Sequence, residues 1–246
     1  MNILISNDDG IEAVGLLTLA ERLSSEHAIF VVAPDREQSA SSHSLTLKRP
    51  LTVREIKENY YSVDGTPADC VNLAVNGILK KSPDIVISGI NHGANLGDDI
   101  LYSGTVSAAM EGLLLKIPSI SVSFEMKRSI DFFPAADFVA TLISFLKKTG
   151  IPNDTVLNIN VPDEITKENP SYKITHQGKR IYDNAIFKSA STGKERIYTI
   201  GAQGIRFETD SESDFNAVIK GFVSITPLHL DMTNYASFEE LHLWKL

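Results

Sequence analysis

The chain has 246 residues, of which 43% are hydrophobic and 22% charged, and its formal net charge is −8, as in an ordinary globular protein with one large α/β domain or a domain with an added part. Because non-specific binding to nucleic acid needs clustered positive charge, the acidic balance argues against a nucleic-acid duplex as a partner. No apolar run approaches the ~20 residues of a membrane span, and no basic region precedes the first apolar run, so we expect a cytoplasmic protein without membrane contact.

Strand-like and helix-like segments alternate through the first two thirds of the chain. Short apolar runs predict strands at 3–6, 28–33, 84–88, 120–123 and 156–161. Apolar residues at helical spacing predict helices over 16–23 and 135–148, the second ending at Gly150. This alternation favours an α/β fold with a Rossmann-like, mostly parallel sheet flanked by helices, and we place that core at residues 1–162.

Two regions depart from the alternation. Residues 43–65 contain many Ser, Thr and β-branched residues and predict a loop and hairpin, after which Thr66-Pro67-Ala68-Asp69 has the pattern of a helix start. Residues 163–246 predict a β-rich extension, with a strand near 196–200 and another at 222–226.

A helix is expected from about residue 234 to residue 244, at the end of the extension. Leu241, Leu243 and Trp244 are apolar for a terminal segment. They either cover the protein's own core or reach into a second subunit as a C-terminal oligomerisation segment.

Polar segments follow three of the predicted strands at their C-terminal ends. Asp8 and Asp9 come directly after strand 3–6, residues 35–40 follow strand 28–33, and the glycine-rich residues 89–97 follow strand 84–88. Parallel sheets bind ligands at this edge, so we expect the three segments to meet there. Two adjacent carboxylates would repel an anionic ligand unless a cation lay between them and it.

Ser103, Gly104 and Thr105 open an Ala-rich helix. Small side chains, two hydroxyls, free N–H groups and the positive end of the helix dipole suit an anion. The alternative is that Ser103 or Thr105 only caps its own helix, and the acidic pair could likewise cap the first helix. The occurrence of all these features at one sheet edge favours a ligand site.

The available ligand atoms limit the choice of metal. Two carboxylates, a hydroxyl and an amide oxygen form a hard, all-oxygen set that suits Mg²⁺ or Mn²⁺, with water or phosphate in the remaining positions. The sequence has no Cys cluster and no closely spaced His pair for a structural zinc site.

A series of motifs resembles the SurE family of survival proteins, which are nucleoside-monophosphate phosphatases. The matching segments, in chain order, are ISNDDGI at 5–11, VAPDR at 32–36, SLTL at 44–47, GTPADCV at 65–71, SGIN at 88–91, NLGDD at 95–99, YSGTVSAAMEG at 102–112, LNINVP at 157–162 and GFVSITPLH at 221–229. The resemblance runs nearly from end to end and is weakest over 163–220. The family often has Pro where Ala94 stands here.

The resemblance implies a phosphatase of nucleoside 5′- and 3′-monophosphates, acting in some members on polyphosphate, with one divalent cation per subunit. It implies a homodimer or tetramer in which C-terminal segments are exchanged. The family's metal ligands fall here on Asp8, Asp9, Ser39 and Asn91. Its phosphate-binding positions fall on Asn95, Ser103, Gly104 and Thr105.

The expected catalytic residues are Asp8 and Asp9. The one less committed to the metal would position or deprotonate the attacking water, and a covalent aspartyl-phosphate is the rival mechanism. His92 and His229 are further acid–base candidates, each with a surface or structural role as its alternative. The non-enzymatic alternative is a Mg²⁺-binding phospho-receiver or a nucleotide-binding module without hydrolysis. Receiver domains are about half this length, and they need an acceptor Asp where Ser88 stands.

Overall fold

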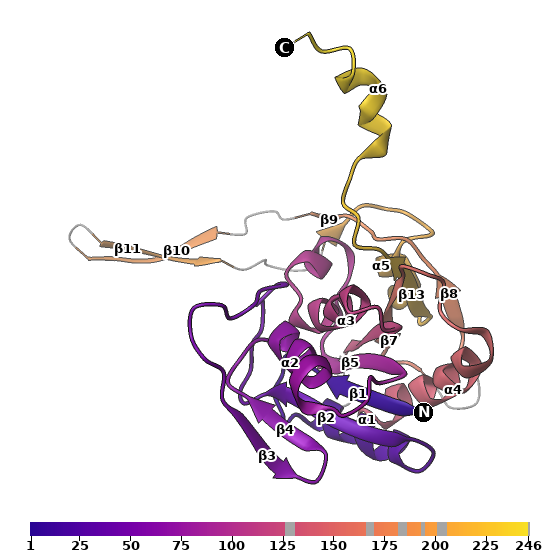
Figure 1. Ribbon diagram of the computed structural model, residues 1–246. Helices are drawn as coiled ribbons and strands as arrows, with labels where there is room; N and C mark the ends of the chain where they lie inside the picture. The colour runs from indigo at the N-terminus through magenta and orange to yellow at the C-terminus, as the bar shows by residue number, and fades with distance from the viewer. Residues whose placement is uncertain (126–130, 166–169, 182–185, 193–194, 201–205, 246) are drawn as a thin grey trace.

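The computed structural model describes residues 1–125, 131–165, 170–181, 186–192, 195–200 and 206–245 (Figure 1). Its centre is a nine-stranded sheet. The strands are β1 (Asn2–Ser6), β2 (Ala28–Pro34), β3 (Val53–Lys57), β4 (Tyr60–Val63), β5 (Ile85–His92), β6 (Ser119–Glu125), β7 (Val156–Pro162), β8 (Tyr172–Ile174) and β13 (Val223–Leu228). Their order is β3-β4-β2-β1-β5-β6-β7-β13-β8, and pairing is parallel from β4 to β7.

Helices cover both faces of this sheet. The larger ones are α1 (Val14–Ser24), α2 (Pro67–Leu73), α3 (Gly104–Leu114) and α4 (Phe133–Thr149). Because side chains alternate along a strand, Ile3 and Ile5 of β1 pack in one core with α1 and α4, while Leu4 packs in a second core with α2 and α3. The predicted Rossmann-like α/β fold is confirmed, and the apolar strand runs reflect burial on both faces.

The predicted helix start at Thr66 is also confirmed. The Thr66 hydroxyl accepts the Asp69 N–H at 3.1 Å, and the Asp69 carboxylate accepts the Thr66 N–H at 2.9 Å, which is a capping box. A π-helical turn, η1 (Ala74–Ile78), continues α2.

Strand β5 continues past its predicted end at Ser88. Its pairing with β6 is irregular between Ser88 and Asn91 and then resumes, with Asn91 opposite Ser123. A β-carbon on Gly89, which has a φ of +136°, would lie 2.3 Å from the Val122 carbonyl oxygen, so only glycine fits there. The strand therefore carries Asn91 and His92, and the loop begins at Gly93.

The segment after residue 162 contributes β13 and β8 to the edge of the main sheet, with β13 antiparallel to β7. A hairpin of β10 (Ile186–Thr192) and β11 (Glu195–Ile200) projects from the body, and it confirms the strand predicted near 196–200 (Figure 1). A short pair joins β9 (Arg180–Ile181) to β12 (Arg206–Phe207). The division of the chain at residue 162 stays a prediction.

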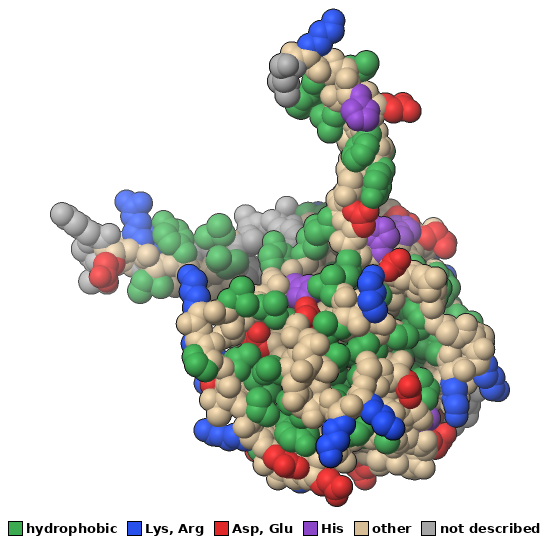
Figure 2. Space-filling model, viewed as in Figure 1, with side chains coloured by type: hydrophobic (Ala, Val, Ile, Leu, Met, Phe, Trp, Pro, Cys, Tyr) green, Lys and Arg blue, Asp and Glu red, His purple; other side chains and the backbone are tan. Residues whose placement is uncertain are grey.

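Leu230 still packs on the body, and the C-terminal arm that follows, residues 232–245, stands away from it (Figure 1). Instead of one helix over 234–244, it forms a 3₁₀ turn, η3 (Tyr235–Ser237), and a single turn, α6 (Phe238–Leu241), because short helices without packing partners are marginal. Apolar side chains lie along it (Figure 2), and Leu243 and Trp244 are 78% and 61% exposed. The tail therefore does not cover the protein's own core. Among the described residues, no helix is both long and apolar enough to cross a membrane.

A buried carboxylate joins the extension to the core. Asp214, at the start of α5 (Asp214–Ile219), accepts the backbone N–H groups of Gly97, Gly178 and Phe215 at 2.8 to 2.9 Å. Gly97 begins the 3₁₀ turn η2 (Gly97–Leu101), which leads into α3. Burial raises the pKa of Asp214, while the three N–H groups act in the opposite direction.

We expect Asp214→Asn to lower the free energy of unfolding by about 3 kcal/mol, because an amide cannot accept all three buried N–H groups. Urea denaturation measures this loss. Asp210→Asn is the control, since Asp210 pairs with His176 at 2.9 Å on the surface and should contribute less than about 1 kcal/mol. Equal, small losses in both variants would contradict the structural role given to Asp214.

Candidate active site

A polar cavity of about 520 Å³ opens at the C-terminal edge of the sheet, where β1, β2 and β5 end and α3 begins. The residues that line it are Asp8, Asp9, Glu37, Ser39, Ala40, Asn91, His92, Ala94, Asn95, Asp99, Tyr102 and Ser103. All four predicted metal ligands are among them, as are two of the four predicted phosphate positions, Asn95 and Ser103. The three polar segments therefore meet at one edge, as the strand pattern predicted.

A tight turn after β1 presents the acidic pair. The buried Asn7 side chain donates to the Gly10 carbonyl at 2.9 Å and accepts the Gly10 N–H at 3.2 Å, so it closes the turn around Asp8 and Asp9. Helix α1 begins after Ala13, and no side chain caps it. The alternative that the acidic pair caps this helix is therefore wrong.

Burial raises the pKa of both carboxylates. Burial raises the pKa of Asp8 to about 6, the charge of Asp9 adds to the rise, and the hydrogen bond from the Thr105 hydroxyl opposes it. Burial also raises the pKa of Asp9, whose carboxylate accepts the His92 backbone N–H at 3.2 Å. Asp8 is buried and Asp9 is half-buried, and two adjacent carboxylates with raised pKa values are short of positive charge, which a bound cation would supply.

The start of α3 packs against Asp8. The Ser103 hydroxyl caps the helix by accepting the Val106 N–H at 3.1 Å, yet Ser103 also lines the cavity. Thr105 is fully buried and donates its hydroxyl hydrogen to Asp8. A β-carbon on Gly104 would lie 2.7 Å from the Asp8 β-carbon. Gly104 and Thr105 thus lie beneath the cavity against Asp8, and their role toward phosphate stays a prediction.

Two asparagines of β7 hold Asn95 in place, and the motif analysis gave them no role. Asn160 accepts the Asn95 backbone N–H at 2.7 Å, and Asn158 and Asn160 both donate to the Asn95 carbonyl, at 2.9 and 3.0 Å. The Asn95 amide in turn donates to Ser123 at 2.8 Å. The signal in the sequence was the alternation of the polar residues Asn158 and Asn160 with apolar residues in a strand that is buried except at Leu157.

The loop that carries Ser39 is docked on the helices by a second network. The Ser39 hydroxyl donates to Glu37 at 2.6 Å. Farther along the loop, His43 contacts the buried carboxylate of Glu111 on α3 at 2.7 Å, and Asn72 donates to the same carboxylate at 2.7 Å. The hydrogen bond from His43 is the largest influence that lowers the pKa of Glu111.

We expect Glu111→Gln to destabilise the protein most at neutral pH. A carboxylate whose folded pKa is lowered stabilises the fold above its unfolded pKa, and this contribution is lost as pH falls through the folded value. The difference in unfolding free energy between the parent and Glu111→Gln should therefore shrink below about pH 4. His43→Ala should move this loss of stability to higher pH. If the difference in unfolding free energy between the parent and Glu111→Gln stayed constant down to about pH 3, the role given to Glu111 would be contradicted.

The two candidate histidines lie in different places. His92 is at the rim of the cavity, where its exposed ring meets Phe132 edge-on at 6.4 Å. His229 does not line the cavity; it borders a separate hollow together with Lys116 and Asp154. The structure therefore separates His229 from the acidic pair.

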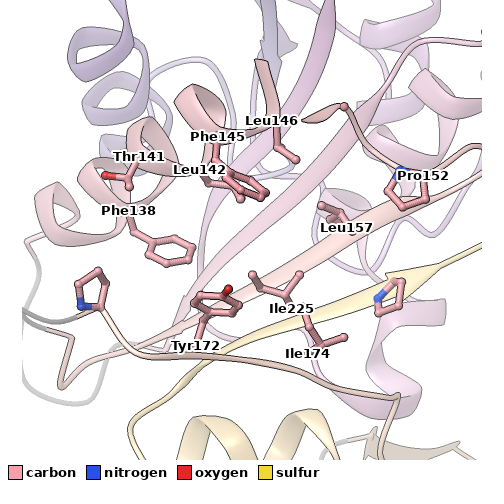
Figure 3. A pocket seen from close by; sticks show the side chains of 13 residues that line it. Phe138, Thr141, Leu142, Phe145, Leu146, Pro152, Leu157, Tyr172, Ile174 and Ile225 are labelled. Carbon is pink, nitrogen blue, oxygen red and sulfur yellow. The ribbon is translucent and has the colours of Figure 1, made fainter. Parts of the chain in front are cut away.

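A second hollow, of about 510 Å³, lies between α4 and the strands β7, β8 and β13 (Figure 3). Its labelled side chains, among them Phe138, Phe145, Tyr172 and Ile225, point toward one another across the groove (Figure 3). The described residues that line it include no Asp, Glu, His, Lys or Arg. It lacks the groups that phosphoryl transfer requires, so the polar cavity is the candidate active site.

Comparisons with known proteins show which family the chain belongs to. The family model described as survival protein SurE matches residues 3–184. The chain is 49% identical over 247 residues to a protein named 5′-nucleotidase SurE from Geotalea uraniireducens, with 100% of both chains covered. It is 43% identical over 244 residues to the protein of that name from Pseudoalteromonas atlantica, covering 99% of this chain and 98% of the relative.

The crystal structure of the SurE protein from Aquifex aeolicus shares the fold, with a TM-score of 0.89, 44% sequence identity and 98% of each chain covered. The likeness thus includes the extension and the arm as well as the Rossmann-like core. With a family model that spans most of the chain and full-length relatives nearly half identical to it, this chain belongs to the SurE family.

Proposed function

We propose that the polar cavity hydrolyses nucleoside 5′-monophosphates to nucleoside and phosphate with the help of one divalent cation. The enzyme class predicted from the sequence, a 5′-nucleotidase, agrees with the name of its full-length relatives. The observation that carries the proposal for the site is the adjacent pair of carboxylates, buried Asp8 and half-buried Asp9, in a cavity whose described lining contains no Lys or Arg.

The residues present suit a hard cation. Asp8, Asp9, Ser39 and Asn91 offer only oxygen ligands, and the Asn91 amide nitrogen is already used in a hydrogen bond to the Gly93 carbonyl at 2.8 Å. That bond leaves the amide oxygen for a ligand. We propose Mg²⁺ or Mn²⁺, whose preferred ligands these are. When bound, such a cation offers positive charge to the phosphoryl oxygens and lowers the pKa of water.

The acidic residues divide the remaining work. Asp8 is buried and engaged with Thr105, whereas Asp9 is half-buried and accepts a longer hydrogen bond from the His92 N–H, so we assign to Asp9 the positioning and deprotonation of the attacking water. The Ser103 hydroxyl accepts the Val106 N–H and therefore keeps its own hydrogen for a phosphoryl oxygen. The Asn95 side-chain amide, whose backbone is fixed by β7, would donate to the phosphoryl group next to the Ser103 hydroxyl.

The charge of the cavity lining indicates which other phosphate compounds suit the site. Four carboxylates, those of Asp8, Asp9, Glu37 and Asp99, border the cavity; within the described part of the chain only Asp99 is paired with an Arg, Arg180, and no Lys or Arg is among the described lining residues. A single phosphate on a neutral nucleoside is easier to accommodate there than a polyanion. We therefore propose that the site also hydrolyses nucleoside 3′-monophosphates and that polyphosphate is its poorest substrate.

The exposed apolar arm supports self-association. A segment that presents Tyr235, Phe238, Leu241, Leu243 and Trp244 to solvent is typical of an interaction surface. We propose a homodimer or tetramer formed through these C-terminal segments. Light scattering should give a mass of two or four chains, and a monomer at all concentrations would contradict it.

Release of inorganic phosphate from AMP tests the function. We expect hydrolysis with Mn²⁺, its loss in EDTA and its return when the metal is restored. Tight binding of AMP and Mn²⁺ without any phosphate release would instead favour the non-hydrolytic alternative. Single-turnover hydrolysis in ¹⁸O-water separates the two mechanisms, since direct attack labels the first phosphate released and an aspartyl-phosphate need not.

A further inference from the structure

Tyr102 is the one large aromatic side chain among the described cavity residues apart from the His92 ring. It is 59% exposed, although Ser103 and Gly104 next to it are buried. No hydrogen bond or ring contact of its side chain occurs within the described part of the chain. An aromatic ring that is exposed to water beside the cavity, with no partner within the described fold, is available to contact a ligand.

The backbone of Tyr102 is nevertheless fixed on two sides. Its N–H donates to the Asp99 carbonyl at 3.0 Å, and its own carbonyl accepts the Ser42 N–H at 3.2 Å. The residue thus links η2 to the loop that carries Ser39. The next residue along the chain is Ser103, to which we assign a phosphoryl oxygen, so the ring is attached at the edge of the phosphate position.

The rest of the lining offers little to a nucleobase. It consists of carboxylates, hydroxyls and amides, two alanines (Ala40 and Ala94), and the His92 ring, which already meets Phe132 edge-on. A base is planar and weakly polar on its faces, so its natural partner is an aromatic face, and such stacking is tolerant of base identity. A carboxylate-rich wall cannot provide this contact.

We propose that the Tyr102 ring stacks on the base of the nucleotide and is the residue that makes this site prefer nucleotides over other phosphate monoesters. The inference rests on the proposed function and adds its substrate recognition. Because every base has a π-face, the contact should serve purine and pyrimidine nucleotides alike, with larger bases gaining more.

Kinetics with two substrates that share the ribose 5-phosphate part test the inference. For Tyr102→Ala we expect kcat/KM for AMP to fall about tenfold through a higher KM, with kcat/KM for ribose 5-phosphate unchanged. Tyr102→Phe keeps the ring and should retain the parental values for both substrates. Tyr172→Ala is the matched control, since Tyr172 is 60% exposed but lies at the apolar groove.

Two results would overturn the role of Tyr102. An equal loss on AMP and ribose 5-phosphate would mean that Tyr102 only positions the loop and helix, and no loss on either would mean that the ring is not used. Failure of the parent enzyme to hydrolyse either compound would instead reject the proposed phosphatase function. The ratio of kcat/KM for AMP to kcat/KM for ribose 5-phosphate must also be higher in the parent enzyme than in Tyr102→Ala.

Discussion

Asp8→Asn is expected to lower kcat/KM for AMP by about 10³-fold, the largest loss we predict from a single atom change. The substitution removes one of the two negative charges that we propose as cation ligands while keeping the shape of the side chain. Thr105 can still donate to the amide oxygen, so the turn and α3 should stay in place. Asp154→Asn, on the exposed surface, should leave the activity unchanged.

The same variant should be more stable than the parent when both are free of metal. Burial raises the Asp8 pKa from 3.8 to about 6, so above about pH 6 the carboxylate costs the folded state about 3 kcal/mol. Below about pH 4 both the folded and the unfolded states are protonated, and the difference should vanish. Urea denaturation in EDTA measures it, and an Asp8→Asn protein less stable than the parent at about pH 8 would contradict this description of the site.

Gly104→Ala is expected to lower kcat by about 100-fold, although the change adds only one methyl group. That methyl group would lie 2.7 Å from the Asp8 β-carbon and 2.9 Å from both an Asp8 carboxylate oxygen and the Ser41 hydroxyl. The two contacts with Asp8 cannot relax without moving Asp8 or α3, so the acidic pair should lose its geometry. Initial rates with saturating AMP and Mn²⁺ measure the effect.

Gly112→Ala is the matched control for this prediction. Gly112 lies in the same helix, and its new β-carbon would meet the Ser119 hydroxyl at 2.3 Å and Val86 at 2.9 Å, away from Asp8. Both variants should lose stability through overpacking, by about 1–3 kcal/mol. Only Gly104→Ala should lose kcat per folded molecule. Equal kcat losses would mean that general strain in α3, and not contact with Asp8, is responsible.

The sheet and the meeting of the polar segments could be predicted from the sequence because both follow from local pattern. Continuous apolar runs such as 3–6 fit only a strand buried on both faces, and residues after parallel strands share one edge. Asp8, Ser39 and Asn91 therefore came together as expected.

The supporting contacts could not be predicted in the same way. Pairing of His43 with Glu111 joins residues 68 apart, and Asn160 holds Asn95 from 65 residues away. Such contacts depend on the packing of side chains from separate elements, which no local pattern encodes. The engagement of Thr105 with Asp8 is of the same kind: the helix start was recognised, but the direction of its hydroxyl depends on how closely Gly104 lets α3 approach β1.

The arm shows a limit of periodicity. Apolar spacing over 234–244 suggested one helix, yet only short turns form, because helical stability in proteins comes mainly from packing an apolar face. Without a surface to pack against, the pattern alone does not suffice.

Titration of Mn²⁺ into the metal-free protein, followed by the loss of its free electron paramagnetic resonance signal, tests the central assignment most directly. The proposed oxygen site of Asp8, Asp9, Ser39 and Asn91, which all line the polar cavity, predicts one bound ion per chain in the parent protein. In a folded Asp8→Asn, Asp9→Asn double variant, that binding should disappear. One ion per chain bound with parental affinity by the double variant would contradict the account.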